Sequence, residues 1–146
     1  MLERHAYLFE DQEVWGEPFI AMIARLIAEY LADNDPEREA AWIAELDGDR
    51  VGSVYCMRRS HEVAQLRLMF VEREARGHGV GSKMVEHCIA FARERGYERM
   101  MLSTVSPLES ARRIYDAAGF TQTKEKPDPA FPDGALAQEM WLDLKR

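Results

Sequence analysis

Cysteine is scarce in this chain, and its placement excludes two kinds of stabilising site. The two cysteines, Cys56 and Cys88, lie far apart in the sequence and in no spacing that suits a metal ion. We therefore expect neither a disulfide framework nor a zinc site, and no bound metal. Two buried thiols in a reducing compartment are the simplest interpretation.

Long apolar runs are also missing. No stretch reaches the roughly 20 consecutive apolar residues that a membrane-spanning helix needs. Residues 1–5 (MLERH) lack the apolar core of a secretory signal peptide. We therefore expect a cytoplasmic protein with no membrane partner.

Basic side chains are in the minority. The chain has 19 Lys and Arg against 26 Asp and Glu, which gives a net charge of -7. Proteins that bind nucleic acid by neutralising its phosphates have a charge of the opposite sign. Nucleic acid is therefore not an expected partner, and the acidic surface by itself names no substrate.

The residues that are present indicate one folded domain. The chain has 146 residues, of which 47% are apolar and 31% are charged. This length and composition suit a single globular core. Because no linker, repeat or low-complexity stretch interrupts the chain, we expect one domain over residues 1–146.

Helical periodicity appears in three places. Apolar residues recur on one face over residues 19–31 and over residues 80–95. A third helix should follow the SPLE motif of residues 106–109, which has the pattern of a capping box formed by Ser106 and Glu109. A short additional helix is expected to begin at Pro36.

Strand-like segments fill most of the remaining chain. They are residues 42–46, 51–57, 63–71, 99–105, 120–125 and 136–144. Asp47-Gly48-Asp49 should join the first two in a hairpin. In the third, Leu66, Leu68 and Phe70 should share one face, and Gln65, Arg67 and Met69 the other. The order of elements predicts a mixed α/β (α+β) domain with a single, mostly antiparallel mixed sheet flanked by helices.

A glycine-rich turn joins the third strand to the helix of residues 80–95. Its sequence is Arg76-Gly77-His78-Gly79-Val80-Gly81. Glycines let backbone N–H groups approach an anion, and the N-terminus of the following helix adds a partial positive charge. The arrangement predicts a phosphate site that suits a pyrophosphate.

Three other interpretations compete for these glycines. A dinucleotide fingerprint needs G-x-G-x-x-G, whereas Gly77, Gly79 and Gly81 are spaced G-x-G-x-G. A P-loop needs lysine followed by a hydroxyl residue, and Ser82-Lys83 has the reverse order. A turn without a ligand is the third alternative, and its place between strand and helix makes it less favoured.

Two motifs resemble those of the GNAT superfamily of N-acetyltransferases. The glycine turn matches the signature R/Q-x-x-G-x-G/A, and residues 111–120 (ARRIYDAAGF) resemble the block A-x-x-[LI]-Y-x-x-x-G-F. Residues 15–144 are also similar to the acetyltransferase half of bacterial MarR-type winged-helix fusion proteins. We expect the winged helix, and with it the DNA-binding part, to be absent here.

The resemblance implies a GNAT-type fold with acetyl-CoA as co-substrate. Met69, Phe70 and Val71 would bind the pantetheine arm through their backbone, and Phe70 or Val71 would supply an N–H for the acetyl oxygen. The pyrophosphate would be bound by the glycine turn, namely by Arg76, Gly77, His78, Gly79, Val80, Gly81 and Ser82.

The resemblance also implies a catalytic acid. Tyr115 stands where the family places the group that returns a proton to the CoA thiolate. Its position on an apolar stripe with Ala111 and Ile114 is equally typical of a core tyrosine. Leu108 replaces the asparagine that usually precedes this helix.

No general base is evident. Gln65 and Ser103 stand where some relatives have a glutamate. His61, Glu62 and Glu72 are left as candidates, together with a water relay. Arg67 would either pair with an acid such as Glu62 or bind an anionic part of the substrate, and pairing is favoured.

These observations predict an N-acetyltransferase in which a primary amine attacks acetyl-CoA directly. The acceptor would be a small molecule or a peptide, and a homodimer is left open. A non-catalytic acyl-CoA-binding or regulatory module is the alternative, because the expected glutamates are missing. The predicted burial of Cys56 and Cys88 disfavours an acetyl-cysteine intermediate.

Overall fold

The computed structural model describes residues 16–33, 35–127 and 134–145. Within these ranges, strands and helices alternate in the order that the periodicity predicts. The elements are α2 (Gly16–Asp33), β1 (Ala40–Leu46), β2 (Asp49–Arg58), β3 (Val63–Val71), the 3-10 turn η1 (Arg73–Ala75), α3 (Val80–Glu94), β4 (Arg99–Val105), α4 (Glu109–Ala118), β5 (Thr121–Pro127) and β6 (Leu136–Asp143).

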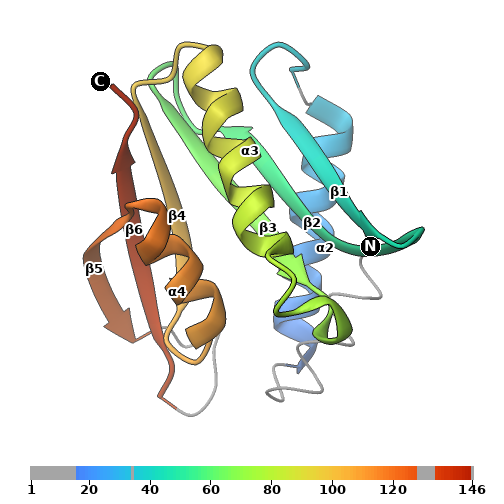
Figure 1. Ribbon diagram of the computed structural model, residues 1–146. Coiled ribbons are helices and arrows are strands. Elements are labelled where there is room, and N and C mark those ends of the chain that lie inside the picture. Colours follow the sequence, from blue (N-terminus) through green and yellow to red (C-terminus); the bar gives the residue numbers. More distant parts are fainter. Residues whose placement is uncertain (1–15, 34, 128–133, 146) are drawn as a thin grey trace.

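The six strands form one mixed sheet in the order β1-β2-β3-β4-β6-β5. Every neighbouring pair is antiparallel except β3 and β4, which run parallel and are joined by the crossover helix α3. Helices α3 and α4 lie on one face and α2 on the other (Figure 1). The predicted fold class is therefore confirmed.

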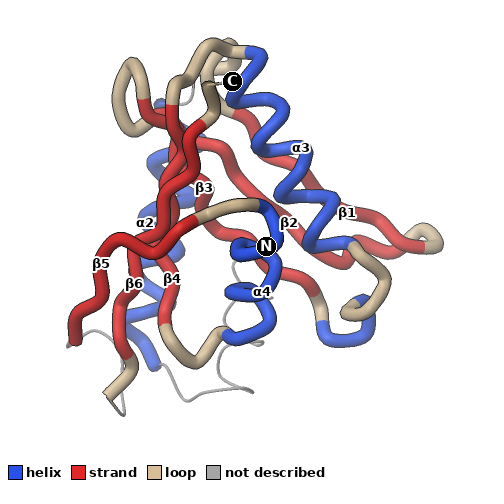
Figure 2. Tube along the Cα trace, turned by 60° about the vertical axis from the view of Figure 1, so that its left-hand side comes forward, coloured by secondary structure: helices blue, strands red, loops and turns tan. Residues whose placement is uncertain are grey.

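The parallel pair is short. β3 and β4 are in register only from Val63 opposite Arg99 to Gln65 opposite Met101. Beyond that point β3 continues to Val71 and β4 to Val105 without pairing to each other, and the two strands separate (Figure 2). The separation lies where α3 begins and where α4 begins.

A bulge changes which side chains of β3 face the core. Leu68 has a positive φ of 53°, and the register of β2 with β3 shifts between Ser53 and Tyr55. This conformation is unfavourable for a residue with a branched side chain. Past the bulge, Met69 and Val71 pack against the core cluster below α3. The prediction that Leu68 and Phe70 share a face with Leu66 is therefore wrong beyond Leu68, because the extra residue reverses the alternation.

The core lies between the sheet and the two helices α3 and α4. Its members include Val54, Leu66, Val85, Met100 and Met140, all of which are buried. The two cysteines, Cys56 and Cys88, are both fully buried in the same cluster. The opposite face of the sheet is approached by α2, whose Tyr30 ring lies edge-on 4.9 Å from that of Tyr55.

Of three local features predicted from the sequence, the described residues have one and lack two. Asp47 and Gly48 both have positive φ, as a two-residue hairpin turn requires, so the hairpin is confirmed. The expected helix at Pro36 is only a turn, because β1 begins at Ala40. Ser106 does not cap α4: its hydroxyl instead accepts the N–H of Leu136 at 2.9 Å.

A pair of leucines tests the burial that the fold assigns. Leu102 is 1% exposed, whereas Leu31 is 70% exposed. Leu102→Ala should lower the free energy of unfolding by about 2–5 kcal/mol because it leaves a cavity. The control Leu31→Ala should change it by no more than about 0.5 kcal/mol. Urea unfolding followed by circular dichroism measures both, and similar losses would contradict this packing.

Candidate active site

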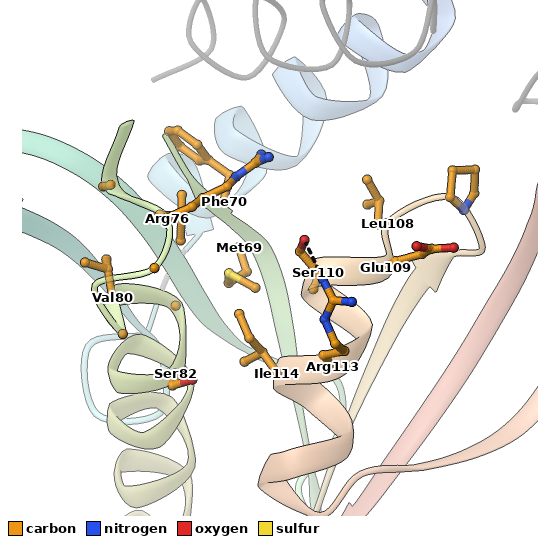
Figure 3. Close-up of a pocket in the computed structure, with 17 residues that line it drawn as sticks. Met69, Phe70, Arg76, Val80, Ser82, Leu108, Glu109, Ser110, Arg113 and Ile114 are labelled. Atoms are coloured by element: carbon orange, nitrogen blue, oxygen red, sulfur yellow. Dashed lines mark hydrogen bonds between the residues drawn. The ribbon is translucent and has the colours of Figure 1, made fainter. Parts of the chain in front are cut away.

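A cavity of about 530 Å³ opens where β3 and β4 separate. One wall is the end of β3 with the glycine turn and the start of α3, and the other is the first half of α4 (Figure 3). Its residues are Met69, Phe70, Val71, Ala75, Arg76, Gly77, Gly79, Val80, Gly81, Ser82, Pro107, Leu108, Glu109, Ser110, Ala111, Arg113 and Ile114.

The glycine turn presents backbone donors to this cavity. Gly77 and Gly79 have φ of 90° and 75°, values that glycine adopts without strain, and Gly79 is the N-cap of α3. The first backbone bond from α3 back to the turn is Lys83 N to Gly79 O at 3.1 Å. The amides before Lys83 therefore have no helical partner, and they lie at the positive end of the helix, an arrangement that suits an anion.

Gly81 has a different function from the two glycines before it. A Cβ on Gly81 would lie 2.7 Å from Cδ1 of Ile114 and 3.4 Å from Cγ2 of Val71. The missing side chain therefore lets α3 approach α4 and the end of β3 closely. This close packing fixes the distance between the two walls of the cavity.

The end of β3 supplies the second set of backbone groups. On one edge, Phe70 and Val71 pair with Ser53 and Gly52 of β2. The other edge faces the separation from β4, and its pairing with β4 ends at Gln65. Such an edge can bond an extended ligand that carries amide groups, as another strand would.

The wall formed by α4 is anchored from behind. Nε of Arg112 lies 3.0 Å from Oδ1 of Asp116, and its Nη1 donates to Oε1 of Gln122 on β5 at 2.7 Å. On the cavity side, Nη2 of Arg113 donates to the Ser110 hydroxyl at 3.3 Å. Arg113 and Arg76 are cationic side chains on the cavity wall. Both cations suit an anionic ligand.

Other classes of site receive no support within the part of the chain that the structure describes. No three His, Cys, Asp or Glu side chains lie together there in a way that could hold a metal ion. Among the same residues, no helix is long and apolar enough to cross a membrane.

Comparison with known proteins identifies the family of this chain. The model of the acetyltransferase (GNAT) family matches residues 4–120. The chain belongs to the GNAT family. This confirms the predicted membership of the GNAT superfamily, whereas the narrower resemblance to the winged-helix fusion proteins stays a prediction.

Curated GNAT relatives cover different parts of the chain. An N-acetylaspartate synthetase of Danio rerio is 30% identical over 98 residues, which is 66% of this chain and 35% of that protein. N-alpha-acetyltransferase 30 of Schizosaccharomyces pombe is 26% identical over 125 residues, 82% of this chain and 81% of that protein. The chain spans 35–58% of the length of the first five relatives.

Solved structures share the arrangement of the elements. A nourseothricin acetyltransferase aligns with a TM-score of 0.68 at 27% identity, covering 77% of this chain and 69% of that one. Ard1 from Thermoplasma volcanium aligns with a TM-score of 0.71 at 25% identity, covering 87% and 80%. The GNAT fold extends over most of the chain.

The structure brings together nearly all the residues predicted to bind the cofactor. Of those predicted, only His78 is not on the cavity wall, and it is exposed within the turn. Sequence reasoning singled out Leu108 only as a replacement for the family's asparagine, and it missed Ala75 and, on the α4 wall, Pro107, Glu109, Ser110 and Arg113. For the α4 wall, proximity to the motif block at residues 111–120 was the available signal.

Tyr115 lies behind the α4 wall and does not line the cavity. It is 5% exposed, its ring is 6.1 Å from that of Phe120, and its neighbour Ile114 does line the cavity. Burial, with a smaller contribution from Cys88, raises the pKa of Tyr115 well above its ordinary value. The phenol therefore keeps its proton throughout the physiological range.

The candidates for the general base lie at different distances from the cavity. His61 and Glu62 are exposed before the start of β3, about 25 Å of strand from Val71, so they are too far from the cavity to act. Glu72 is half-buried just after Val71. Glu139 is a half-buried carboxylate that sequence reasoning missed, opposite Ser103 in the register of β4 and β6.

Two glycines with the same backbone conformation test the anion site. Gly79 and Gly48 both have positive φ, and a Cβ added to either would meet no atom within 4 Å. In Gly79→Asp, the carboxylate would cap the amides of α3 and compete with the diphosphate. Its affinity for coenzyme A should fall at least about tenfold, which is 1.4 kcal/mol.

Gly48→Asp is the control, because it makes the same change of charge in the hairpin between β1 and β2. Isothermal titration calorimetry should find its affinity for coenzyme A unchanged. Equal losses in the two variants would show that charge alone, and not the cradle at Gly79, determines binding.

Proposed function

We propose that this chain transfers an acetyl group from acetyl-CoA to a primary amine by direct attack. The observation that carries the proposal is the cavity that connects the first amides of α3 with the edge of β3 beyond its pairing with β4. The first set of donors suits the diphosphate and the second suits the amide-containing pantetheine arm. The glycines let the diphosphate of acetyl-CoA approach the backbone, and the cations Arg76 and Arg113 suit its negative charge.

The reaction requires two groups from the chain: a donor for the developing oxyanion and an acid for the departing thiolate. When bound, acetyl-CoA supplies an activated acetyl thioester, whose C–S bond breaks as the new C–N bond to the amine forms. An N–H of Phe70 or Val71 at the edge of β3 donates to the carbonyl oxygen as negative charge develops on it. Tyr115 gives its proton to the departing thiolate, and the amine loses a proton to a base or water.

Two observations support Tyr115 as this acid. It follows Ile114, whose side chain lines the cavity, so the two belong to the same turn of α4. Its hydroxyl makes no hydrogen bond within the described residues, and Arg38 Nε is the only buried side-chain polar atom there that lacks a partner. Within the described residues, therefore, no hydrogen-bond partner competes with a ligand for the Tyr115 hydroxyl.

Direct attack is favoured over a covalent acetyl-enzyme. Cys56 and Cys88 are fully buried, and a hydrogen bond with Cys56 together with burial raises the pKa of the Cys88 thiol well above its ordinary value. A buried thiol with a raised pKa is a poor nucleophile. The alternative of a non-catalytic acyl-CoA-binding module is not favoured by the match to N-acetyltransferases.

The acceptor is proposed as a primary amine of a small molecule or peptide. Relatives of this chain are named for both kinds of acetylation, an N-acetylaspartate synthetase and an N-alpha-acetyltransferase. The proposal extends to a cytoplasmic protein, as monomer or homodimer. Its net charge of -7 supports a role that involves no nucleic acid.

The proposed reaction is tested by measuring thiol release from acetyl-CoA over a panel of primary amines. We expect amine-dependent release of coenzyme A, with mass spectrometry showing an amine heavier by one acetyl group. Calorimetry on the same preparation should show binding of acetyl-CoA. Binding without turnover on any amine would favour the non-catalytic alternative.

Two buried tyrosines test the role of the acid. Tyr115→Phe should lower kcat about 100-fold or more, the usual contribution of a general acid, and leave the affinity for acetyl-CoA nearly unchanged. Tyr97→Phe is the control, because Tyr97 is 4% exposed and its hydroxyl donates to Arg38 O at 2.7 Å.

The control variant should lose about 1 kcal/mol of stability and keep its kcat. Because the pKa of Tyr115 is raised, its deprotonation should impose no decline of kcat between pH 8 and about 10. Equal loss of kcat and cofactor affinity in Tyr115→Phe would argue for a packing role instead.

A further inference from the structure

Arg67 is a charged side chain within a strand of mainly apolar residues. Its neighbour Leu66 packs into the core below α3, so Arg67 projects toward the opposite face, the one that α2 approaches. In the register of the sheet it lies opposite Tyr55 of β2. The ring of Tyr55 in turn contacts Tyr30 of α2, so Arg67 lies on the face of the sheet that α2 approaches.

This arginine forms no hydrogen bond or ion pair within the part of the chain that the structure describes, and it is half-buried. The expected pairing with Glu62 is not formed, because Glu62 is exposed at the start of β3. Withdrawing a charge from water without a partner is unfavourable, so a ligand that supplies the missing anion would be stabilised.

The charges around Arg67 add to its attraction for an anion. Nη1 of Arg59 lies 3.3 Å from Sδ of Met101, which brings a second guanidinium over the same face. On α2, Arg25 and Glu29 lie 4.0 Å apart as an exposed pair. Desolvation lowers the pKa of Arg67; Glu29 partly offsets this, and Arg59 and Arg25 lower it further. The cluster therefore has three cations, Arg67, Arg59 and Arg25, and one carboxylate, Glu29, although the net charge of the whole chain is -7.

The position along β3 connects this cluster to the proposed reaction. The last residue of β3 that pairs with β4 is Gln65, opposite Met101, so Arg67 lies just beyond the point where the two strands part. Met69, on the cavity wall, is two residues further along the chain, across the bulge at Leu68. Arg67 projects toward the face that α2 approaches and Met69 toward the core beneath α3, so a group bound at Arg67 would reach the acetyl site through the opening between β3 and β4.

We propose that Arg67, assisted by Arg59, binds an oxyanion of the acceptor, a carboxylate or a phosphate, so that the acceptor is a small amine carrying such a group. This inference rests on the proposed acetyl transfer. A guanidinium binds either oxyanion through parallel hydrogen bonds. With the oxyanion held there, the amine end of the molecule can turn toward the opening between β3 and β4.

Matched acceptors test the proposal. β-Alanine would be compared with β-alaninamide, and O-phosphoethanolamine with ethanolamine, by thiol release with the wild-type chain. We expect kcat/KM to be at least tenfold higher for the anionic member of at least one pair. The pair that shows the preference identifies the oxyanion as carboxylate or phosphate.

Variants assign the preference to a residue. Arg67→Gln should remove the preference and leave the neutral acceptor unchanged, whereas Arg67→Lys should retain part of it because the charge remains. Arg50→Gln, at an exposed arginine of β2, is the control for the change of charge. Because Arg67 has no hydrogen bond or ion pair among the described residues to lose, Arg67→Gln should also unfold at the same temperature as the wild type.

A binding measurement gives a readout other than turnover. With coenzyme A present, the N-acetylated form of the preferred acceptor should bind the wild type more tightly than its neutral counterpart, and Arg67→Gln should abolish the difference. Equal kcat/KM within both pairs would overturn the proposal, as would equal loss for both members in Arg67→Gln. Absence of turnover on every amine would overturn the proposed function, and this inference with it.

Discussion

The short parallel pairing of β3 and β4 is the constraint on which the rest of the site depends. Hydrogen bonds join the strands only as far as Gln65 and Met101, and both strands then continue apart. Backbone groups that leave a sheet need other partners, and a ligand with amide groups can supply them. The bulge at Leu68 lies three residues beyond Gln65 and turns Met69 and Val71 toward the core beneath α3. Two central strands of the sheet, β3 and β4, thus have edges that are not paired to each other and can bond a ligand. A fully paired sheet has such edges only at its two outer strands.

The glycine turn shows that one motif can serve several physical purposes. Gly77 and Gly79 allow a backbone path of positive φ that leaves the first amides of α3 unobstructed. Gly81 allows contact, because Ile114 and Val71 occupy the space that its side chain would need. The unobstructed amides of α3 and the spacing of the two walls are therefore encoded within five residues, by different properties of the same amino acid.

The sequence was sufficient to predict the order and position of nearly every element, because apolar periodicity and glycine placement are local signals. The residues of the glycine turn that line the cavity followed from the same motif. What could not be predicted depended on tertiary contacts: the bulge at Leu68 is invisible in an alternating pattern, and Ser106 bonds β6 although its local pattern is that of a cap. The placement of Tyr115 behind Ile114 depends on how α4 packs against the sheet, which residue types alone do not determine.

The buried cysteines have a practical consequence for anyone working with this protein. Cys56 and Cys88 have no exposed surface, and a hydrogen bond with Cys56 together with burial raises the pKa of the Cys88 thiol. A colorimetric reagent for sulfhydryl groups should hardly react with the native fold, so the only fast signal in solution would come from the small coenzyme. The same two sulfur atoms become reactive once the core opens, which makes them built-in reporters of denaturation that require no label.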